Sequence, residues 1–445
     1  MMFNVFELPR YDSFKESGFG WLGTIPSSWR MKRLKYFSSL KARIGFHGLN
    51  SSDFIDDGAY CITGTDFKNG VVDYSNCYFV SEYWYQLDKN IQVRNGDVLI
   101  TKDGTIGKTA VVEGLERSAT LNSGVFLLRP IINYRYFYWL LKSSIFIEQV
   151  TIISRGSTIN HLYERDFKNF SFTVPAEPQQ SKIARFLDKK TTQIDEAIAI
   201  KEQQIALLKE RKQIIIQKAV TQGLDPNVPM KDSGVDWIGE IPAHWEMKKV
   251  KNIFRLVMEP SEKNNDHELL SVYTDIGVKP RRELEERGNK ASTTDGYWFV
   301  KKGDIVVNKL LAWMGAIGLS EYNGVTSPAY DILRPELPLN GYFYHHLFRS
   351  EFCSAELKRH SRGIMDMRLR LYFDKFGVIE VPYPSVDEQD EIIRALKVKM
   401  SEMDEGIDHL KAQIAKLKEY KTTLINSAVT GKIRITPDMV EAYPA

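Results

Sequence analysis

The stretch SGFGWLGTIPSSWRMK at residues 17–32 returns as SGVDWIGEIPAHWEMK at residues 233–248. The serine, glycine, proline and both tryptophans keep their spacing, and each matching pair is 216 positions apart. Chance does not align so many rare residue types in one order. A repeat decides the architecture before any local pattern does, so the chain is predicted to contain one unit twice. The four tryptophans, Trp21, Trp29, Trp237 and Trp245, are expected to anchor the two cores.

Further matches continue this order along both copies. They are Gly96-Asp97-Val98 with Gly303-Asp304-Ile305, Tyr136-Phe137-Tyr138 with Tyr342-Phe343-Tyr344, and Ser154-Arg155-Gly156 with Ser361-Arg362-Gly363. Residues 38–91 and 254–299 show no convincing match and differ in length. We therefore expect a shared frame in which one variable part has diverged.

Each copy closes with a segment that predicts a long helix. Residues 180–221 match residues 389–430, and both segments stop at a glycine, Gly223 or Gly431, the residue type that caps helix ends. About 40 residues at ~1.5 Å each make a rod of roughly 60 Å. Apolar residues recur in steps of three, four and seven. This predicted seam comprises Ile194, Ile198, Ile205, Leu208 and Ile215 in the first copy, and Met403, Ile407, Leu410, Ile414, Leu417 and Leu424 in the second.

A seam of this length must be buried against another helix, and the second copy supplies one within the same chain. Because a globular unit separates the two helices, we predict that they pair antiparallel. Packing of each helix on its own globular unit, or pairing between two chains, remains open.

The expected fold class is α+β, with two tandem α/β domains related by a pseudo-twofold and separated by two long helices that form an antiparallel coiled coil. Strand-turn-strand segments are predicted at residues 93–101 and 300–307, and aromatic-rich helices at 134–144 and 341–350. The predicted segments are a first domain (1–177), a central helix (178–222), a second domain (223–385), a C-terminal helix (386–431) and a tail (432–445).

Composition excludes several classes of protein. Sixty Lys and Arg against 57 Asp and Glu leave a net charge of +3, so global charge identifies no partner. The amino terminus does not read as a signal peptide, and no apolar run approaches the ~18 residues of a membrane span. Three widely spaced cysteines argue against disulfides and a cysteine-based zinc site. We expect a cytoplasmic protein without a membrane partner.

Motifs for catalysis are mostly missing. The stretch Gly104 to Thr109 resembles a phosphate loop, but the position that requires its first glycine is Lys102. A base methyltransferase motif needs Pro-Pro before an aromatic residue, and the chain has no Pro-Pro dipeptide. The adjacent histidines His345 and His346 lack metal-ligand spacing and fit a helix surface or a core pair. We predict no catalytic residue, no metal and no cofactor in this chain.

Local basic clusters with interleaved glycines remain as candidate nucleic-acid contacts. In the major groove, arginine forms two hydrogen bonds with the edge of guanine, and asparagine forms two with the edge of adenine. Both side chains also bind phosphates. Each of these residues can equally be an ordinary solvated side chain. The candidate DNA contacts are Lys102, Lys108, Arg155, Ser157, Asn160, Lys279, Arg281, Arg282, Lys309, Arg362, Arg368 and Arg370.

The whole pattern resembles the specificity subunit (HsdS) of a type I restriction-modification system. The resemblance covers nearly the whole chain and rests on the doubled order of the motifs. These are the Ile-Pro-x-x-Trp openings (Ile25 to Trp29, Ile241 to Trp245), the Gly-Asp-hydrophobic strands, the Thr101 to Lys108 turn, the helix openings at Gln179-Gln180 and Glu388-Gln389, and the Ile194-Asp195 and Met403-Asp404 steps. The second copy departs where Leu310 to Trp313 replace the Lys-Asp-Gly turn.

The resemblance implies that each globular unit is a target-recognition domain that reads one half of a bipartite, asymmetric DNA site. It implies that the helices set the gap between the halves and dock methyltransferase subunits, two per chain, with restriction subunits joining through the complex. S-adenosylmethionine, ATP and magnesium would belong to those partner subunits. The chain would then be a non-catalytic subunit.

Two other classes of function remain open. A coiled-coil protein adaptor would show no affinity for DNA, whereas a DNA reader loses affinity steeply with salt. A self-contained DNA modification enzyme would bind the methyl donor by itself.

Overall fold

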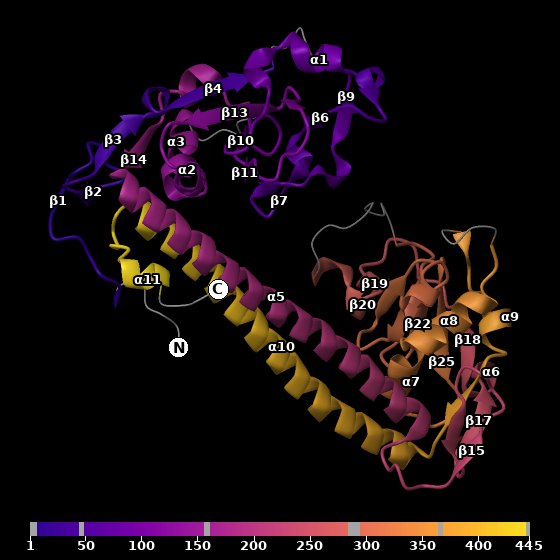
Figure 1. The fold of residues 1–445 in the computed structure, drawn as a ribbon. Helices are drawn as coiled ribbons and strands as arrows, with labels where there is room; N and C mark the ends of the chain where they lie inside the picture. The colour runs from indigo at the N-terminus through magenta and orange to yellow at the C-terminus, as the bar shows by residue number, and fades with distance from the viewer. Residues whose placement is uncertain (1–6, 44–48, 155–160, 284–293, 364–367, 442–445) are drawn as a thin grey trace. The chain divides into compact units, whose positions relative to one another are not determined.

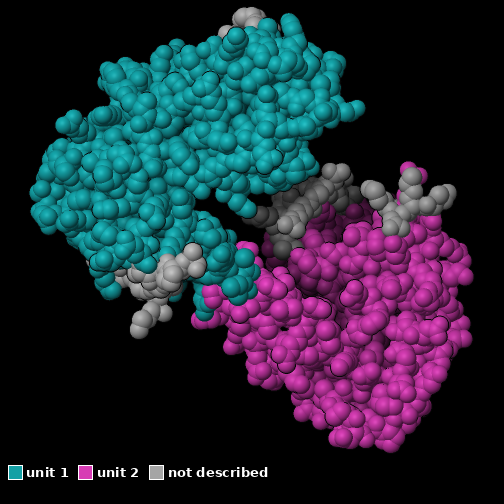
Figure 2. Space-filling model, in the orientation of Figure 1, with its two compact units in different colours: residues 1–200, 412–445 teal, residues 201–411 magenta. Residues whose placement is uncertain are grey.

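The computed structural model describes residues 7–43, 49–154, 161–283, 294–363 and 368–441 (Figure 1). The chain forms two compact units, one made of residues 1–200 and 412–445 and the other of residues 201–411 (Figure 2). We call them unit 1 and unit 2. Unit 1 therefore contains both ends of the chain, while unit 2 is one continuous stretch.

A four-strand core sheet is common to both units. In unit 1 the order is β4 (Ser38–Ala42), β13 (Val125–Pro130), β10 (Val98–Thr101) and β11 (Thr109–Val111), extended by β8 (Val71–Val72) and β7 (Phe67–Lys68). In unit 2 it is β18 (Phe254–Val257), β25 (Tyr330–Pro335), β22 (Ile305–Asn308) and β23 (Ile317–Leu319). All neighbours among these four strands pair antiparallel. The inner strands β10 and β22 are buried along their whole length and are apolar except for their last residues, Thr101 and Asn308, as expected for central strands.

Short paired strands and helices complete the shared frame. The strand pairs are β1 (Phe14–Glu16) with β2 (Thr24–Pro26) and β3 (Arg30–Arg33) with β14 (Ser171–Val174) in unit 1, and β15 (Met230–Asp232) with β16 (Glu240–Pro242) and β17 (Glu246–Lys249) with β26 (Glu380–Tyr383) in unit 2. The helices are α2 (Tyr134–Leu141), α3 (Ser144–Ser154) and α4 (Glu164–Phe167), matched by α7 (Gly341–Phe348), α8 (Glu351–His360) and α9 (Phe373–Phe376). Two further short helices are α6 (Val250–Ile253) and α11 (Pro437–Glu441).

The variable parts differ as the sequence predicts. Unit 1 carries a second sheet and a helix, made of β12 (Ala119–Leu121), β6 (Ala59–Ile62), β9 (Tyr78–Val80), β5 (Phe54–Ile55) and α1 (Glu82–Leu87). Unit 2 has two strand pairs instead, β19 (Leu270–Tyr273) with β20 (Gly277–Pro280) and β21 (Trp298–Val300) with β24 (Gly324–Thr326).

Three local predictions need correction. Residues 93–101 are not a strand-turn-strand hairpin, because the structure has a strand only after the turn, at β10. Residues 300–307 do contain two strands, but β21 pairs with β24 and β22 with β23 and β25. The aromatic-rich helices α2 and α7 correspond at an offset of 207 positions, and not at the 206 positions of the motif match. Phe137 on α2 packs edge-on against Phe37, and Tyr344 on α7, 207 positions later, packs in the same way against Phe254.

Two long helices, α5 (Glu177–Gln222, 46 residues) and α10 (Val386–Val429, 44 residues), run through both units. Each is fastened at its start by a buried glutamine: Gln180 accepts a hydrogen bond from the Asn133 backbone N–H at 2.9 Å, and Gln389 accepts one from Asn340 at 2.8 Å. Figure 1 shows the helices running side by side in opposite directions. The predicted α+β class and the antiparallel pairing of the long helices are confirmed.

Each long helix ends at the predicted glycine, and that glycine contacts an opening motif. Gly223 (φ +74°) lies against Trp245 of the second copy, and Gly431 (φ +73°) lies against Pro26 and Trp29 of the first. Trp29 and Trp245 are each 1% exposed, so they are core anchors as predicted. Trp237 packs at the edge of the unit 2 core and remains partly exposed.

Candidate DNA interface

Lys102 directly follows β10 and is held within unit 1. Its backbone carbonyl accepts a hydrogen bond from Leu162 N–H at 2.8 Å, and its side chain is only 13% exposed. The ammonium group lies 3.5 Å from the Asp103 carboxylate and 5.7 Å from the centre of the Phe126 ring. Lys102 therefore helps to build the loop beside β10, with little of its side chain open to solvent.

Lys108 lies at the other end of the predicted glycine turn. Gly104 (φ +64°) and Gly107 (φ +86°) take the left-handed conformation that favours glycine, so the turn itself is confirmed. The Lys108 ammonium donates a hydrogen bond to the carbonyl of Gly64 at 2.8 Å and lies 6.0 Å from the Phe67 ring. This lysine ties the variable part of unit 1 to the core sheet.

Three candidates of unit 1, Arg155, Ser157 and Asn160, lie outside the described residues. The described chain resumes at His161, whose ring nitrogen forms a hydrogen bond with the Asp103 carboxylate. The neighbouring Tyr163 is 55% exposed, and the Arg165 guanidinium lies over its ring at 5.5 Å. An exposed aromatic ring beside an arginine can stack on a base. His161, Tyr163 and Arg165 were not predicted, although they lie five to nine positions after the Ser-Arg-Gly motif.

Lys309 takes the place of Lys102 in unit 2. Its carbonyl accepts a hydrogen bond from Leu371 N–H at 2.8 Å, as Lys102 does from Leu162. Its ammonium lies 3.3 Å from Asp331 and donates to the Pro328 carbonyl at 3.0 Å. Burial raises the pKa of Asp331, although Lys309 acts against that shift. Lys309 is therefore an internally paired lysine.

Three arginines of unit 2 gather on one loop. Arg362 and Arg370 exchange both backbone hydrogen bonds at 2.9 Å, which places their side chains on neighbouring strands of a short bridge. The Arg362 side chain is 60% exposed and lies 3.3 Å from Asp374. Arg368 and Arg370 are also exposed. Because Leu371 pairs with Lys309, the structure brings four of the predicted cations to one edge of the unit 2 sheet.

The remaining candidates lie in β20 or directly after it, in the variable part of unit 2. Lys279 donates a hydrogen bond to the Tyr322 hydroxyl at 3.1 Å, and this bond raises the pKa of the lysine. Arg281 is half-buried and its backbone N–H bonds to Leu269 at 2.8 Å. Arg282 is 76% exposed and lies 3.0 Å from Glu268. Arg282 is therefore the most open cation of this group.

The adjacent histidines of α7 belong to the packing of unit 2. His345 Nδ1 accepts a hydrogen bond from Leu319 N–H at 3.2 Å. Burial lowers the pKa of His345 to about 3 and that of His346 to about 4. Arg349 below them donates to the carbonyls of Gly315 and Thr274 at 2.6 and 2.9 Å. This arrangement fits the predicted core pair, and no group of three or more His, Cys, Asp or Glu within the described ranges could hold a metal ion.

The seam of the long helices is only partly the one predicted. Ile194, Ile198, Ile407, Ile414 and Leu424 are buried, whereas Ile205, Leu208, Ile215, Met403, Leu410 and Leu417 are partly exposed. Met400 and Ile216 are also buried and were missed. Two lysines were missed as well: Lys212 binds Asp404 at 2.6 Å in unit 2, and Lys421 binds Asp195 at 2.6 Å in unit 1. Lys421 lies 209 positions after Lys212, and Asp404 lies 209 positions after Asp195, so the repeat extends to these ion pairs.

The sequence model of the family described as the type I restriction modification DNA specificity domain matches residues 26–210. The chain is 22% identical to the MjaVIII type I restriction enzyme specificity subunit of Methanocaldococcus jannaschii, over 92% of this chain and 94% of that protein. Residues 26–210 belong to this family, and the likeness to type I restriction-modification specificity subunits extends over nearly the whole chain. It is also 24% identical to the EcoBI specificity subunit of Escherichia coli, over 79% and 76% of the two chains.

Solved structures share the fold of this specificity subunit. A chain from a study of complex assembly and conformational transition of the type I R-M system superposes with a TM-score of 0.69 at 15% identity, covering 91% of this chain and 98% of that one. The HsdS subunit of Thermoanaerobacter tengcongensis superposes with a TM-score of 0.55 at 14% identity, covering 94% and 100%. These structures confirm the predicted fold, and the family model with the similar specificity subunits confirms the predicted resemblance.

DNA sequence recognition is the general role of a specificity subunit, and such a subunit is not the catalytic part of its system, as predicted. Among the described parts of the chain, no helix is long and apolar enough to cross a membrane. No comparison bears on the individual DNA contacts, so those twelve residues stay predictions.

Proposed function

We propose that this specificity subunit reads a bipartite, asymmetric DNA site, one half with each unit. The observation that supports this is the shared frame with two different variable parts. The core sheets, the flanking helices and the lysines at the end of β10 and β22 correspond one to one, whereas the four-strand sheet of β5, β6, β9 and β12 is replaced in unit 2 by the strand pairs β19–β20 and β21–β24. Two similar readers with different contact surfaces suit two half-sites of different sequence.

In this proposal the helices α5 and α10 set the gap between the half-sites. A helix of 46 residues extends about 69 Å, which exceeds the ~34 Å of one turn of DNA. The ion pairs Lys212–Asp404 and Lys421–Asp195 hold the antiparallel register at both ends of the pair. The same helices would dock two methyltransferase subunits, through which restriction subunits join the complex.

The chemistry would lie in those partner subunits. S-adenosylmethionine would supply the methyl group to an adenine there, and ATP and magnesium would serve the restriction subunits. Neither needs a site in this chain, and we expect the complex to act in the cytoplasm, on cellular DNA.

Methylation mapping tests the proposal. Genomic DNA from cells that express this chain with its methyltransferase is sequenced by a single-molecule method, and cells that lack only this chain are the control. We expect adenine methylation at a split, asymmetric motif that appears only with the chain. Methylation of a single continuous motif would contradict the assignment of one half-site to each unit.

A further inference from the structure

One guanidinium group ties the variable part of unit 2 to its shared frame. Arg349 caps the carboxyl end of α7 and donates hydrogen bonds to the carbonyls of Tyr273 and Thr274, at 3.4 and 2.9 Å, where the hairpin β19–β20 turns. It also donates to the carbonyls of Gly315 and Ile317, at 2.6 and 3.2 Å, where β23 begins. The donors of a guanidinium form a rigid planar fork, so this side chain fixes the hairpin and the core strand in one geometry.

His345, one turn earlier on α7, makes a second contact with the same two elements. Its Nδ1 accepts a hydrogen bond from the Leu319 N–H of β23 at 3.2 Å. A Cβ at Gly277 of β20 would lie 3.2 Å from the His345 ring, and one at Gly318 of β23 would lie 2.8 Å from it. The helix therefore packs directly on the backbone of both strands and leaves too little room for a side chain at either glycine.

Unit 1 attaches the hairpin β7–β8 of its variable stretch in another way. Val71 of β8 pairs parallel with Val111 of β11, and the Val111 N–H donates to the carbonyl of Gly70 at 2.9 Å. Among the described strands of unit 2, the corresponding β23 is at the edge of its sheet. The position of Arg349 corresponds to Lys142 in unit 1, 207 residues earlier. Side chains of α7 thus serve in unit 2 where unit 1 uses backbone pairing.

Apolar packing holds the hairpin β19–β20 on the core but does not fix its place there. Three of its side chains are buried in one cluster with the core strands: Leu270, Val272 and Val278. Hydrophobic burial has no direction, whereas a hydrogen bond requires a narrow range of distance and angle. The far end of the hairpin is bonded to β24, where the Thr326 hydroxyl donates to the Leu270 carbonyl at 3.1 Å. The polar contacts of α7 therefore place the turn end of the hairpin against the shared frame.

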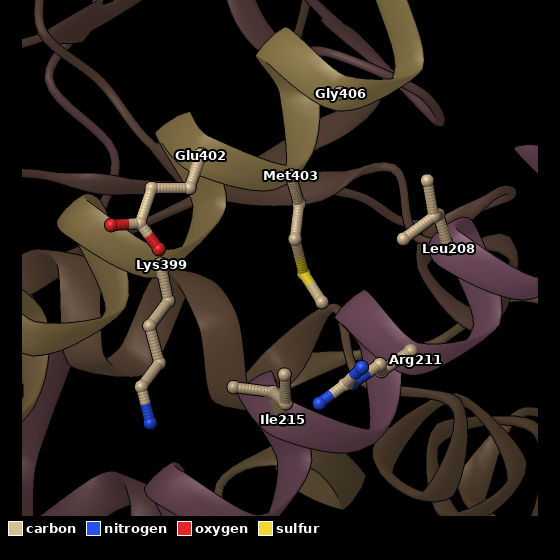
Figure 3. Close-up of a pocket in the computed structure, with 7 residues that line it drawn as sticks. All are labelled: Leu208, Arg211, Ile215, Lys399, Glu402, Met403 and Gly406. Carbon is tan, nitrogen blue, oxygen red and sulfur yellow. The ribbon is translucent and has the colours of Figure 1, made fainter. Parts of the chain in front are cut away.

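The helix α7 is itself seated on the long helices. Its buried side chains share one core with Ile215 of α5 and Met403 of α10. Figure 3 shows the Met403 side chain pointing from α10 toward Ile215. Burial lowers the pKa of His346 to about 4, and the charges of Arg349 and of Lys212 on α5 lower it further. The connection between the hairpin and the long helices therefore runs through α7.

The hairpin carries three of the candidate DNA contacts. Lys279 is in β20, and Arg281 and Arg282 directly follow that strand. Tyr273 pairs with Gly277 beside the turn, so these cations lie toward the opposite end of the hairpin. Groups that form a binding site must be held within about 0.5 Å of their productive geometry. A turn end that is free to shift would therefore displace the cations from the positions that contact DNA.

We propose that Arg349 is a positioning residue for DNA recognition by unit 2, with His345 beside it. By holding the turn end of the hairpin against the core sheet, Arg349 keeps the three cations in register with one half-site. Its own donors face backbone carbonyls, so discrimination of that half-site depends on a side chain that does not itself bind DNA. This inference rests on the proposed reading of one half-site by each unit.

The test measures binding of the full chain, in complex with its methyltransferase, to DNA that carries the mapped motif or a mismatch in either half. Arg349→Met removes the donors and the charge but keeps a long side chain. A mismatch in one half-site should then be discriminated about tenfold less than by the wild type, while discrimination of the other should change by less than about twofold. The slope of log K against log salt concentration should stay the same, because no phosphate contact is lost. Arg349→Lys keeps a cation with three donors and should recover part of the discrimination.

Lys142→Met is the matched control at the equivalent position of unit 1. Lys142 is exposed, and the hairpin β7–β8 is held by backbone pairing, so this variant should leave both half-sites within about twofold of the wild type. Hydrogen exchange of the same complexes separates positioning from folding. In Arg349→Met the amides of residues 270–280 should exchange faster, while those of β22 and β25 stay as protected as in the wild type.

Wild-type discrimination of both half-sites by Arg349→Met would overturn the inference and leave the proposed function intact. Weaker binding to all these DNAs, with faster exchange in β22 and β25, would also overturn it, because Arg349 would then serve the fold of unit 2 as a whole. A salt slope reduced by about one would make Arg349 a direct phosphate contact, contrary to the proposal. A wild-type complex that discriminates neither half-site would remove the proposed function together with this inference.

Discussion

The ammonium group of Lys212 on α5 lies 2.6 Å from both carboxylate oxygens of Asp404 on α10. Lys421, its counterpart in the repeat, binds both carboxylate oxygens of Asp195 in the same way, at 2.7 and 2.6 Å. Lys212 and Lys421 both fall at seam positions where a heptad pattern calls for an apolar residue. A polar residue at a single seam position costs stability and specifies register.

A double-mutant cycle on Lys212 and Asp404 measures that role. Each side chain is replaced by alanine, singly and together, and the free energy of unfolding is followed by denaturant. Because the two side chains are 23% and 56% exposed, we expect a coupling free energy of only ~0.5–1 kcal/mol. The pair Lys411 and Asp408, which lies on one helix with both side chains mostly exposed, is the control and should couple more weakly. Equal coupling in the two cycles would contradict a special role for the seam pair.

Acid should destabilise unit 2 through its histidines. Burial lowers the pKa of His345 to about 3 and of His346 to about 4, against ~6.5 in an unfolded chain. Between these values the unfolded state takes up protons that the folded state does not, so stability falls as the pH drops from about 6.5 toward 4. Both side chains keep some exposure, so we expect ~1–2 kcal/mol per histidine by pH 5.

His345→Asn checks this prediction, because the asparagine amide oxygen can accept a hydrogen bond from Leu319. The variant should lose less stability than the wild type between pH 7 and pH 5 in thermal unfolding. His409→Asn changes an exposed histidine of α10 and should leave the pH dependence unchanged. The same pH slope in all three proteins would show that His345 does not carry the effect.

Loss of the loop arginines should affect one half-site at a time. Arg362→Ala removes a 60% exposed guanidinium from unit 2, and Arg155→Ala removes its counterpart in the repeat. Loss of a contact to a base should cost ~1–3 kcal/mol of binding free energy at that half-site. Loss of a contact to a phosphate should weaken binding to all sequences and reduce the slope of log K against log salt concentration by about one. Binding of DNA with mismatches in either half-site separates the two cases. A variant that binds all these DNAs as the wild type does would remove its arginine from the interface.

The length of the helices should set the gap of the DNA site. Deleting seven residues at equivalent positions of α5 and α10 preserves the heptad pattern and shortens each helix by about 10 Å. We expect the methylated motif to keep both half-sequences with a shorter gap. Methylation mapping of cells with this variant is the measurement, and an unchanged gap would refute the spacer role.

Features with a strong periodic or repeated signal could be predicted from the sequence. The duplication at Trp29 and Trp245, the long helices and their glycine ends follow from spacing alone, since helix periodicity and capping are local properties. Strand pairing was harder, because β10 and β22 are buried on both faces and show no alternation. Their partners lie far along the chain, and a hairpin was wrongly predicted where the chain makes a turn between different sheets.

The sequence predicted which residue types could contact DNA, but not which of these side chains are exposed to solvent. Lys102, Lys108 and Lys309 look like Arg362 in the sequence, yet the structure pairs all three lysines internally. Whether a cation faces solvent depends on contacts such as that between Lys108 and Gly64, 44 positions apart, which no local pattern reveals.

The contact of Gly431 with Pro26 and Trp29 has a consequence for synthesis on the ribosome. Unit 2 is one continuous stretch and can complete its core as soon as residue 411 has emerged. Unit 1 begins the chain but needs residues 412–435 to cover its opening motif, so its first two hundred residues must wait while the whole of unit 2 is made. The domain that is translated first is therefore the last to finish folding, and a nascent chain that stops early leaves the Trp29 surface uncovered.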